Sequence, residues 1–131
     1  MKRSYLWFAP AVAVTIGIFA LSTFLVVPTQ AKDANNLDKI EHAFAYMVLT
    51  LSFVIAFYRT GNLTIKVAFK VFLISGGYGI LMELSQYYFF EHRHFDWDDA
   101  IANVVGTAIG FLVFGIKYIS ITKMQQICNK K

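Results

Sequence analysis

The chain has 131 residues, 57% of them apolar and only 15% charged, with a formal net charge of +4. A soluble domain of this size needs more polar surface than such a composition supplies. The length leaves room for one domain, residues 1–131, and the basic residues are spread along the chain, so no nucleic-acid partner is expected. The composition favours a membrane protein whose main partner is the lipid bilayer.

Four apolar stretches predict helices at about residues 5–27, 42–58, 70–90 and 99–118. A helix needs about 20 apolar residues to cross a bilayer core about 30 Å thick. The second and fourth stretches are short, but Arg59 and Lys117 at their ends can extend their side chains to the interface. No segment alternates as a barrel strand does. The predicted fold class is all-α, a polytopic bundle of four transmembrane helices.

The two ends of these helices differ in charge. Most Lys and Arg residues precede the first helix, join the second to the third, or follow the fourth. All eight acidic residues fall at the opposite end, namely Asp33, Asp38, Glu41, Glu83, Glu91, Asp96, Asp98 and Asp99. Because basic loops stay in the cytoplasm, we expect both termini to be cytoplasmic in a multi-pass inner-membrane (cell-membrane) protein.

The first segment has an alternative interpretation as a secretory signal peptide. Lys2 and Arg3 would form its basic start, and Thr29-Gln30-Ala31 a weak cleavage site. Its apolar stretch of about 23 residues exceeds the 7–15 residues of a signal core, which favours a retained helix.

Residues typical of helix ends agree with these boundaries. Asp38 suits the first turn of the second helix, and Glu41 follows it at capping-box spacing. Gly61 and Asn62 suit a helix stop and a tight turn. Three acidic residues meet the positive end of the fourth helix dipole: Asp96, Asp98 and Asp99.

Small and polar residues form a stripe on each of the last three helices. On the third helix they recur three or four positions apart, which places them on one face: Gly76, Gly79, Glu83 and Gln86. The fourth helix has Asp99, Asn103, Gly106 and Gly110, and the second has Asp38, His42 and Tyr46. We expect the glycines of the third and fourth helices to pack against each other deep in the bilayer. The polar residues would then meet near the outer surface.

Glu83 is the costly member of this set. A carboxylate at the bilayer centre costs about 2.5–3.5 kcal/mol, and less off-centre, unless it is paired or protonated. Arg93 or Lys39 can pair with it from above. Its expected hydrogen-bond partners are Gln86, Asn103 and Tyr46.

The order and spacing of these residues are informative in combination. Between Asp38 and Gly110 they form three blocks: Asp38-Lys39-x-x-His42-x-x-x-Tyr46, Glu83-x-x-Gln86 and Arg93-x-x-Asp96-x-x-Asp99-x-x-x-Asn103-x-x-Gly106-x-x-x-Gly110. The combination resembles the VanZ-like family, small bacterial membrane proteins named for an accessory protein linked to teicoplanin resistance. The resemblance implies a cell-envelope context without defining a reaction. Glu91-His92 stands where members often have a Pro-Gly turn, so the resemblance does not position Arg93.

The polar residues of the blocks are the candidate binding residues: Asp38, Lys39, His42, Tyr46, Glu83, Gln86, Arg93, Asp96, Asp99 and Asn103. Three readings of them stay open. They can form a purely structural interhelical network, bind a polar headgroup, glycan or peptide at the outer leaflet, or catalyse a reaction. In the catalytic reading His42 is base or nucleophile and Glu83 is general acid or base. Ion conduction has weaker support, because it rests on a single acidic residue within the membrane.

A metal site is a further alternative, with Asp38, His42, Glu83 and Asp99 as one nitrogen and three oxygen ligands. Zinc usually takes more His or Cys ligands, and His92 and His94 lie in a loop without helical spacing to His42. We therefore expect no metal and no cofactor. The primary hypothesis is a protein that binds an envelope component, such as a lipid-linked precursor, or another membrane protein. Such binding would influence glycopeptide susceptibility.

Overall fold

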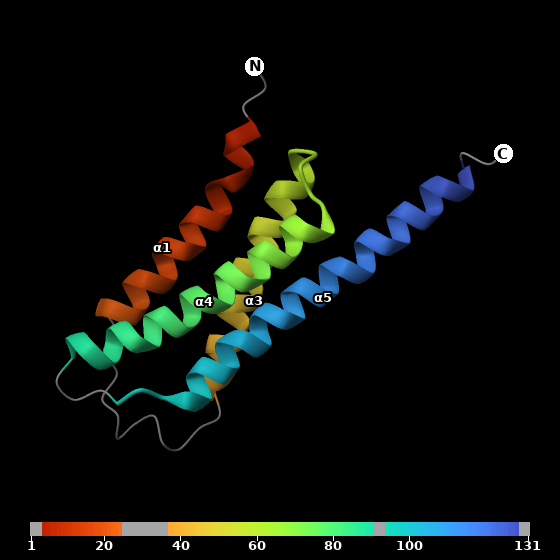
Figure 1. Ribbon diagram of the computed structural model, residues 1–131. Helices are drawn as coiled ribbons and strands as arrows, with labels where there is room; N and C mark the ends of the chain where they lie inside the picture. Colours follow the sequence, from red (N-terminus) through yellow and green to blue (C-terminus); the bar gives the residue numbers. More distant parts are fainter. Residues whose placement is uncertain (1–3, 25–36, 91–93, 129–131) are drawn as a thin grey trace.

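The computed structural model describes residues 4–24, 37–90 and 94–128, and every regular element in them is helical. A short 3-10 helix, η1 (Ser4–Phe8), leads into α1 (Ala9–Phe24), and α3 (Leu37–Arg59), α4 (Ile65–Phe89) and α5 (Trp97–Cys128) follow (Figure 1). Within these residues, four segments are long and apolar enough to cross a membrane: Ser4–Phe24, Leu37–Arg59, Ile65–Phe89 and Trp97–Gly115. The predicted all-α class with four membrane helices is confirmed.

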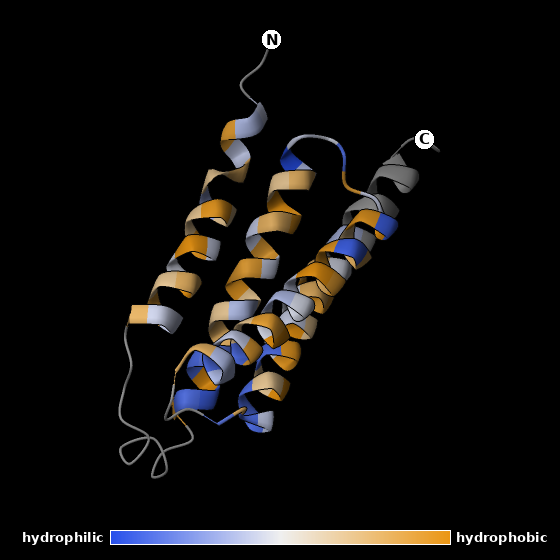
Figure 2. Ribbon diagram, turned by 60° about the vertical axis from the view of Figure 1, so that its left-hand side comes forward, coloured by the Kyte–Doolittle hydropathy of each residue, from blue (hydrophilic) through white to orange (hydrophobic). Residues whose placement is uncertain are grey.

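The helix α3 is the centre of the bundle and contacts α1, α4 and α5. Its most extensive contact is with α5, which starts at the same end of the molecule and runs in the same direction (Figure 1). The helix α4 runs the opposite way and packs on both, while α1 packs on α3 and α4. Figure 2 shows apolar residues along most of each helix and hydrophilic residues gathered towards the helix ends. The beginnings of α3 and α5 therefore lie beside the end of α4.

The helices extend beyond the apolar stretches that predicted them. The helix α3 begins at Leu37 rather than 42, α4 begins at Ile65 rather than 70, and α5 continues to Cys128, past the predicted end at 118. Hydropathy marks the part of a helix immersed in lipid, whereas the helix itself continues through polar residues until a cap or turn ends it. The predicted end of the first helix at Val27 and the segment 28–36, including the weak cleavage site, lie outside the described residues.

The turn between α3 and α4 follows the glycine that predicted it. Gly61 has a positive φ of 73°, which an L-residue with a side chain rarely adopts. Its N–H donates to the Tyr58 carbonyl at 3.1 Å, and the Asn62 N–H donates to the Phe57 carbonyl at 3.0 Å. These two bonds form a Schellman motif, which satisfies the last carbonyls of α3. The turn is therefore short, and α4 returns directly along α3.

The glycines of α5 pack against α3, and not against the glycines of α4 as the sequence predicted. A Cβ atom placed on Gly106 would overlap the backbone of Ala43, with its Cα only 2.7 Å away. A Cβ on Gly110 would lie 2.9 Å from the Met47 carbonyl oxygen. A Cβ on Gly76 would meet nothing within 4 Å. The sequence paired these glycines because they lie at a similar depth in the bilayer. Depth alone does not say which helix a glycine contacts, since α3, α4 and α5 all surround the same space.

Gly106→Ala is expected to destabilise the protein by about 1–3 kcal/mol or more, because the new methyl group meets α3 backbone, which cannot rotate away. Thermal unfolding in detergent micelles measures the loss. Gly76→Ala is the matched control, since it makes the same change in a membrane helix where space is open. Equal melting temperatures for the two variants would contradict the close contact between α3 and α5.

Candidate functional site

The polar residues of three helices meet at the end of the bundle where α3 and α5 begin. Side chains that face inward here are buried although they are polar or charged: Glu83, Gln86, Asp99 and Asn103. Asp38 and His42 lie at the edge of the same region, with 25% and 20% of their side chains exposed. Asp33, Glu91, His92 and Arg93 lie outside the described residues. The region is polar, within membrane-spanning helices, and partly exposed at one edge.

His42 links two of these helices. Its Nδ1 lies 2.9 Å from the Asp38 main-chain oxygen, one turn earlier in α3. A carbonyl oxygen only accepts, so Nδ1 carries the proton and donates it to this oxygen. The neutral ring therefore keeps a lone pair on Nε2, which lies 3.7 Å from Oε1 of Glu83 on α4. At this separation the two groups form no direct hydrogen bond, but they are close enough to contact one ligand together.

Glu83 is only 3% exposed, and its neighbours differ from those predicted. The amide of Gln86 donates instead to the Ser22 carbonyl oxygen at 3.3 Å and so joins α4 to α1. Lys39 forms an ion pair with Asp98 at 3.2 Å, across the start of α3 and α5. Tyr46 lies close enough to Glu83 to interact with it electrostatically. Asn103 and Tyr46 form no hydrogen bond with Glu83 either, so the expected roles of Gln86, Asn103, Tyr46 and Lys39 as its direct partners are wrong.

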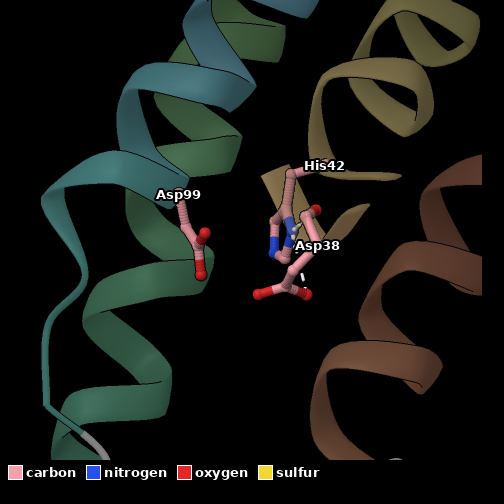
Figure 3. A group of neighbouring side chains, drawn as sticks. All are labelled: Asp38, His42 and Asp99. Atoms are coloured by element: carbon pink, nitrogen blue, oxygen red, sulfur yellow. Dashed lines mark hydrogen bonds and ion pairs between the residues drawn. The ribbon is translucent and has the colours of Figure 1, made fainter. Parts of the chain in front are cut away.

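Asp99 approaches His42 from the neighbouring helix. It is 4% exposed and lies in the first turn of α5, parallel to the first turn of α3 that holds Asp38. One ligand atom from each of Asp38, His42 and Asp99 lies within 4.8 Å of the others. Figure 3 shows the three side chains directed into the same space between α3 and α5. The structure thus brings together a ring nitrogen of His42 and carboxylate oxygens of Asp38 and Asp99.

Asn103 and Tyr46 lie one helical turn deeper than this group. Both are nearly fully buried, at 0% and 2% exposure, and they pack together against Gly79. A Cβ on Gly79 would lie 2.8 Å from the Asn103 Cβ and 3.1 Å from the Tyr46 ring. Neither amide atom of Asn103, nor the Tyr46 hydroxyl, has a hydrogen-bond partner within the part of the chain that the structure describes. Each such group costs about 1–3 kcal/mol unless something satisfies it.

Asp96 has a structural position at the edge of the site. Its Oδ1 accepts hydrogen bonds from the backbone N–H groups of Asp98 at 2.9 Å and of Asp99 at 3.4 Å. It therefore caps the N-terminus of α5, which orients the first turn that carries Asp99. The binding role of Asp96 stays a prediction, and its observed role is to cap α5.

Asp98 was not among the predicted site residues, yet it joins α5 to α3 through Lys39. A signal was present in the sequence. Lys39 directly follows Asp38, and Asp98 directly precedes Asp99, so opposite charges stand beside two of the candidate residues. Only the parallel arrangement of α3 and α5 brings the two pairs together.

These observations define a multi-pass α-helical membrane protein with a polar site shared by three helices at one end. The chain matches the VanZ/LLP1 family over residues 4–118, and it belongs to that family. The family resemblance drawn from residues between Asp38 and Gly110 is confirmed. Comparison with curated proteins and comparison with solved structures gave no match.

Asp96→Ala is expected to lower the free energy of unfolding by about 0.5–2 kcal/mol, because α5 loses its cap. Asp96→Asn should retain most of the stability, since asparagine caps a helix as well as aspartate does. Denaturant unfolding in detergent compares the two, with the exposed change His94→Ala as control. Unchanged stability in Asp96→Ala would show that the capping bonds contribute little.

Proposed function

We propose that this protein binds the polar headgroup of a cell-envelope component at the outer leaflet of the inner membrane. The observation that carries the proposal is the site itself. His42, Glu83 and Asp99 come from three different helices and converge within membrane-spanning segments. Asn103 and Tyr46 add buried polar atoms beneath them that have no hydrogen-bond partner within the described residues. Polar groups are costly at this depth, and a polar ligand offsets that cost.

The surroundings of the site suit a ligand that is itself anchored in the membrane. Ile40 and Phe44 on α3 and Ile101 on α5 are 58–61% exposed beside the polar residues. A lipid-linked ligand can keep its hydrocarbon chain against such faces while its headgroup reaches His42 and Asp38 at the exposed edge. Binding of this kind suits a lipid-linked envelope precursor and, through it, an effect on teicoplanin susceptibility.

The proposed orientation places the acidic end outside and both termini in the cytoplasm. The support is the distribution of basic residues, which favours a cytoplasmic location for the turn that contains Gly61 and Asn62. In this orientation the ion pair of Lys39 with Asp98 lies at the outer surface.

A second candidate function is enzymatic, and the geometry of His42 favours it specifically. The bond from Nδ1 to the Asp38 main-chain oxygen fixes the tautomer, and Nε2 faces the Glu83 carboxylate at 3.7 Å. Such a pair can move a proton to or from a headgroup. This candidate requires a lipid or glycan product that disappears in His42→Ala cells, which comparative mass spectrometry of lipids and muropeptides detects.

Glu83→Gln tests the binding proposal, because it removes the charge with little change of shape. We expect the purified variant to unfold near the wild-type temperature. In a deletion strain, the wild-type protein should restore the original teicoplanin susceptibility and the variant should not. The measurements are thermal unfolding in detergent and the inhibitory teicoplanin concentration in a deletion strain complemented with each variant.

Glu41→Gln is the control for that experiment, since Glu41 is an exposed acid in the first two turns of α3. It should leave both measurements unchanged. Loss of stability together with loss of the phenotype in Glu83→Gln would favour a structural network. Wild-type behaviour in both measurements would remove Glu83 from the site.

Cysteine labelling tests the orientation. In a Cys128→Ser background, His94→Cys places a thiol at the acidic end and Asn62→Cys places one in the turn between α3 and α4; both positions are exposed. A membrane-impermeant maleimide added to intact cells should label position 94 and leave position 62 unlabelled until the cells are broken. The reverse pattern would contradict the proposed orientation and, with it, the outer-leaflet location of the site.

A further inference from the structure

We propose that Asp38, His42 and Asp99 bind a divalent metal ion, with Glu83 beside them. The inference goes beyond the proposed function, because binding of the ion does not depend on any envelope ligand. Asp38 and His42 are successive inward positions of α3, and Asp99 is the matching position of the parallel helix α5. One donor atom from each lies within 4.8 Å of the other two. Two helices thus contribute ligands to one point between them (Figure 3).

The distances are close to those that a bound ion requires. Ligand bonds of about 2.1 Å place donors about 3–4.2 Å apart on a common ion. The separation of up to 4.8 Å therefore closes by small rotations of the side chains. Asp38 and His42 are the more exposed members, with 25% and 20% of their side chains accessible, which leaves a route for the ion.

The protonation of His42 suits metal binding. Metal-ligating histidines commonly donate one ring N–H to a carbonyl or carboxylate, which fixes the ring and leaves the other nitrogen as the ligand. Nδ1 of His42 donates to the Asp38 main-chain oxygen at 2.9 Å. The remaining nitrogen, Nε2, lies 3.7 Å from Glu83 Oε1. Glu83 lies outside the three converging ligands, and its Oε1 is near enough to His42 to accept a hydrogen bond from a metal-bound water.

The ligand set indicates the class of metal. Carboxylate oxygens suit Mg²⁺, Ca²⁺ and Mn²⁺, whereas imidazole suits first-row transition metals. One imidazole with two or three carboxylates meets both preferences in Mn²⁺ and disfavours Mg²⁺, which binds few nitrogen ligands. A divalent ion also carries the positive charge that the neighbouring carboxylates of Asp38 and Asp99 favour.

A second, independent observation points to a polar occupant. The Asn103 amide and the Tyr46 hydroxyl are buried one turn below the donors and have no hydrogen-bond partner among the described residues. Side chains on a helix tilt towards its N-terminus. Because α3 and α5 both begin at the site, Tyr46 and Asn103 lean towards His42 and Asp99. Water bound to an ion at that position supplies the missing hydrogen-bond partners.

The test uses Mn²⁺ alone with the purified full-length protein in detergent, after treatment with a chelator. Titration followed by electron paramagnetic resonance should show loss of the free Mn²⁺ signal until about one ion is bound per chain. Electron spin echo envelope modulation should then detect a nitrogen ligand. His42→Ala should abolish that nitrogen signal and weaken binding roughly 10–100-fold, and Asp99→Asn should weaken binding similarly.

Matched controls separate this site from general attraction of cations to acidic groups. His94→Ala and Glu41→Gln change exposed residues at the same end of the molecule and should leave Mn²⁺ binding and the nitrogen signal unchanged. If Asp99→Asn fails to fold, as judged by gel filtration, Asp38→Asn at the exposed edge replaces it. Absence of binding, or binding without a His42-dependent nitrogen signal, would overturn the proposal. Either result leaves the teicoplanin measurements on Glu83→Gln as a separate test of headgroup binding.

Discussion

The close approach of α5 to α3 at Gly106 determines how the polar residues meet. With no Cβ at this position, the α5 backbone rests against Ala43, and Gly110 repeats the contact one turn deeper against Met47. The contact fixes both the distance and the register of two parallel helices. Towards the N-termini of the two helices, this register places Asp99 beside His42 and Asp98 beside Lys39. A larger residue at the contact would separate the helices and disperse the site, although no site residue had changed.

The parallel arrangement also sets the electrostatics of the site. Both α3 and α5 present their N-termini there, so two positive dipole ends face the same space. Carboxylates at 38 and 99 are favourable in that position, and the Asp96 cap adds order to the start of α5. The helix α4 contributes its C-terminal half to the site, so the positive end of its dipole lies at the other end of the bundle. Glu83 is 3% exposed, and His42 on α3 is near it at 3.7 Å.

Much of this was predictable from the sequence, because a membrane limits the possible structures. Apolar length gave the four helices, and helical periodicity gave the inward face of the last three, including the stripe from Gly76 to Gln86. Neighbours within the bundle were less predictable. Periodicity says which residues share a face, but several arrangements of four helices bury the same faces. The predicted contact between the glycines of α4 and α5, and Lys39 as partner of Glu83, failed for this reason. The arrangement of the helices in space determines both the contacts of these glycines and the partner of Lys39.

Interhelical hydrogen bonding does not account for every buried polar group of the site. A structural network gains stability from polar side chains that satisfy one another across helices. Asn103 on α5 and Tyr46 on α3 both pack against Gly79, yet their polar atoms have no hydrogen-bond partner among the described residues. Apolar side chains of similar size would pack the same space without that cost. The attachment of α1 shows what a structural polar contact looks like here, since Gln86 donates directly to a carbonyl oxygen of α1. The unsatisfied atoms of Asn103 and Tyr46 are therefore the feature of the site that supports the proposed binding of a polar ligand.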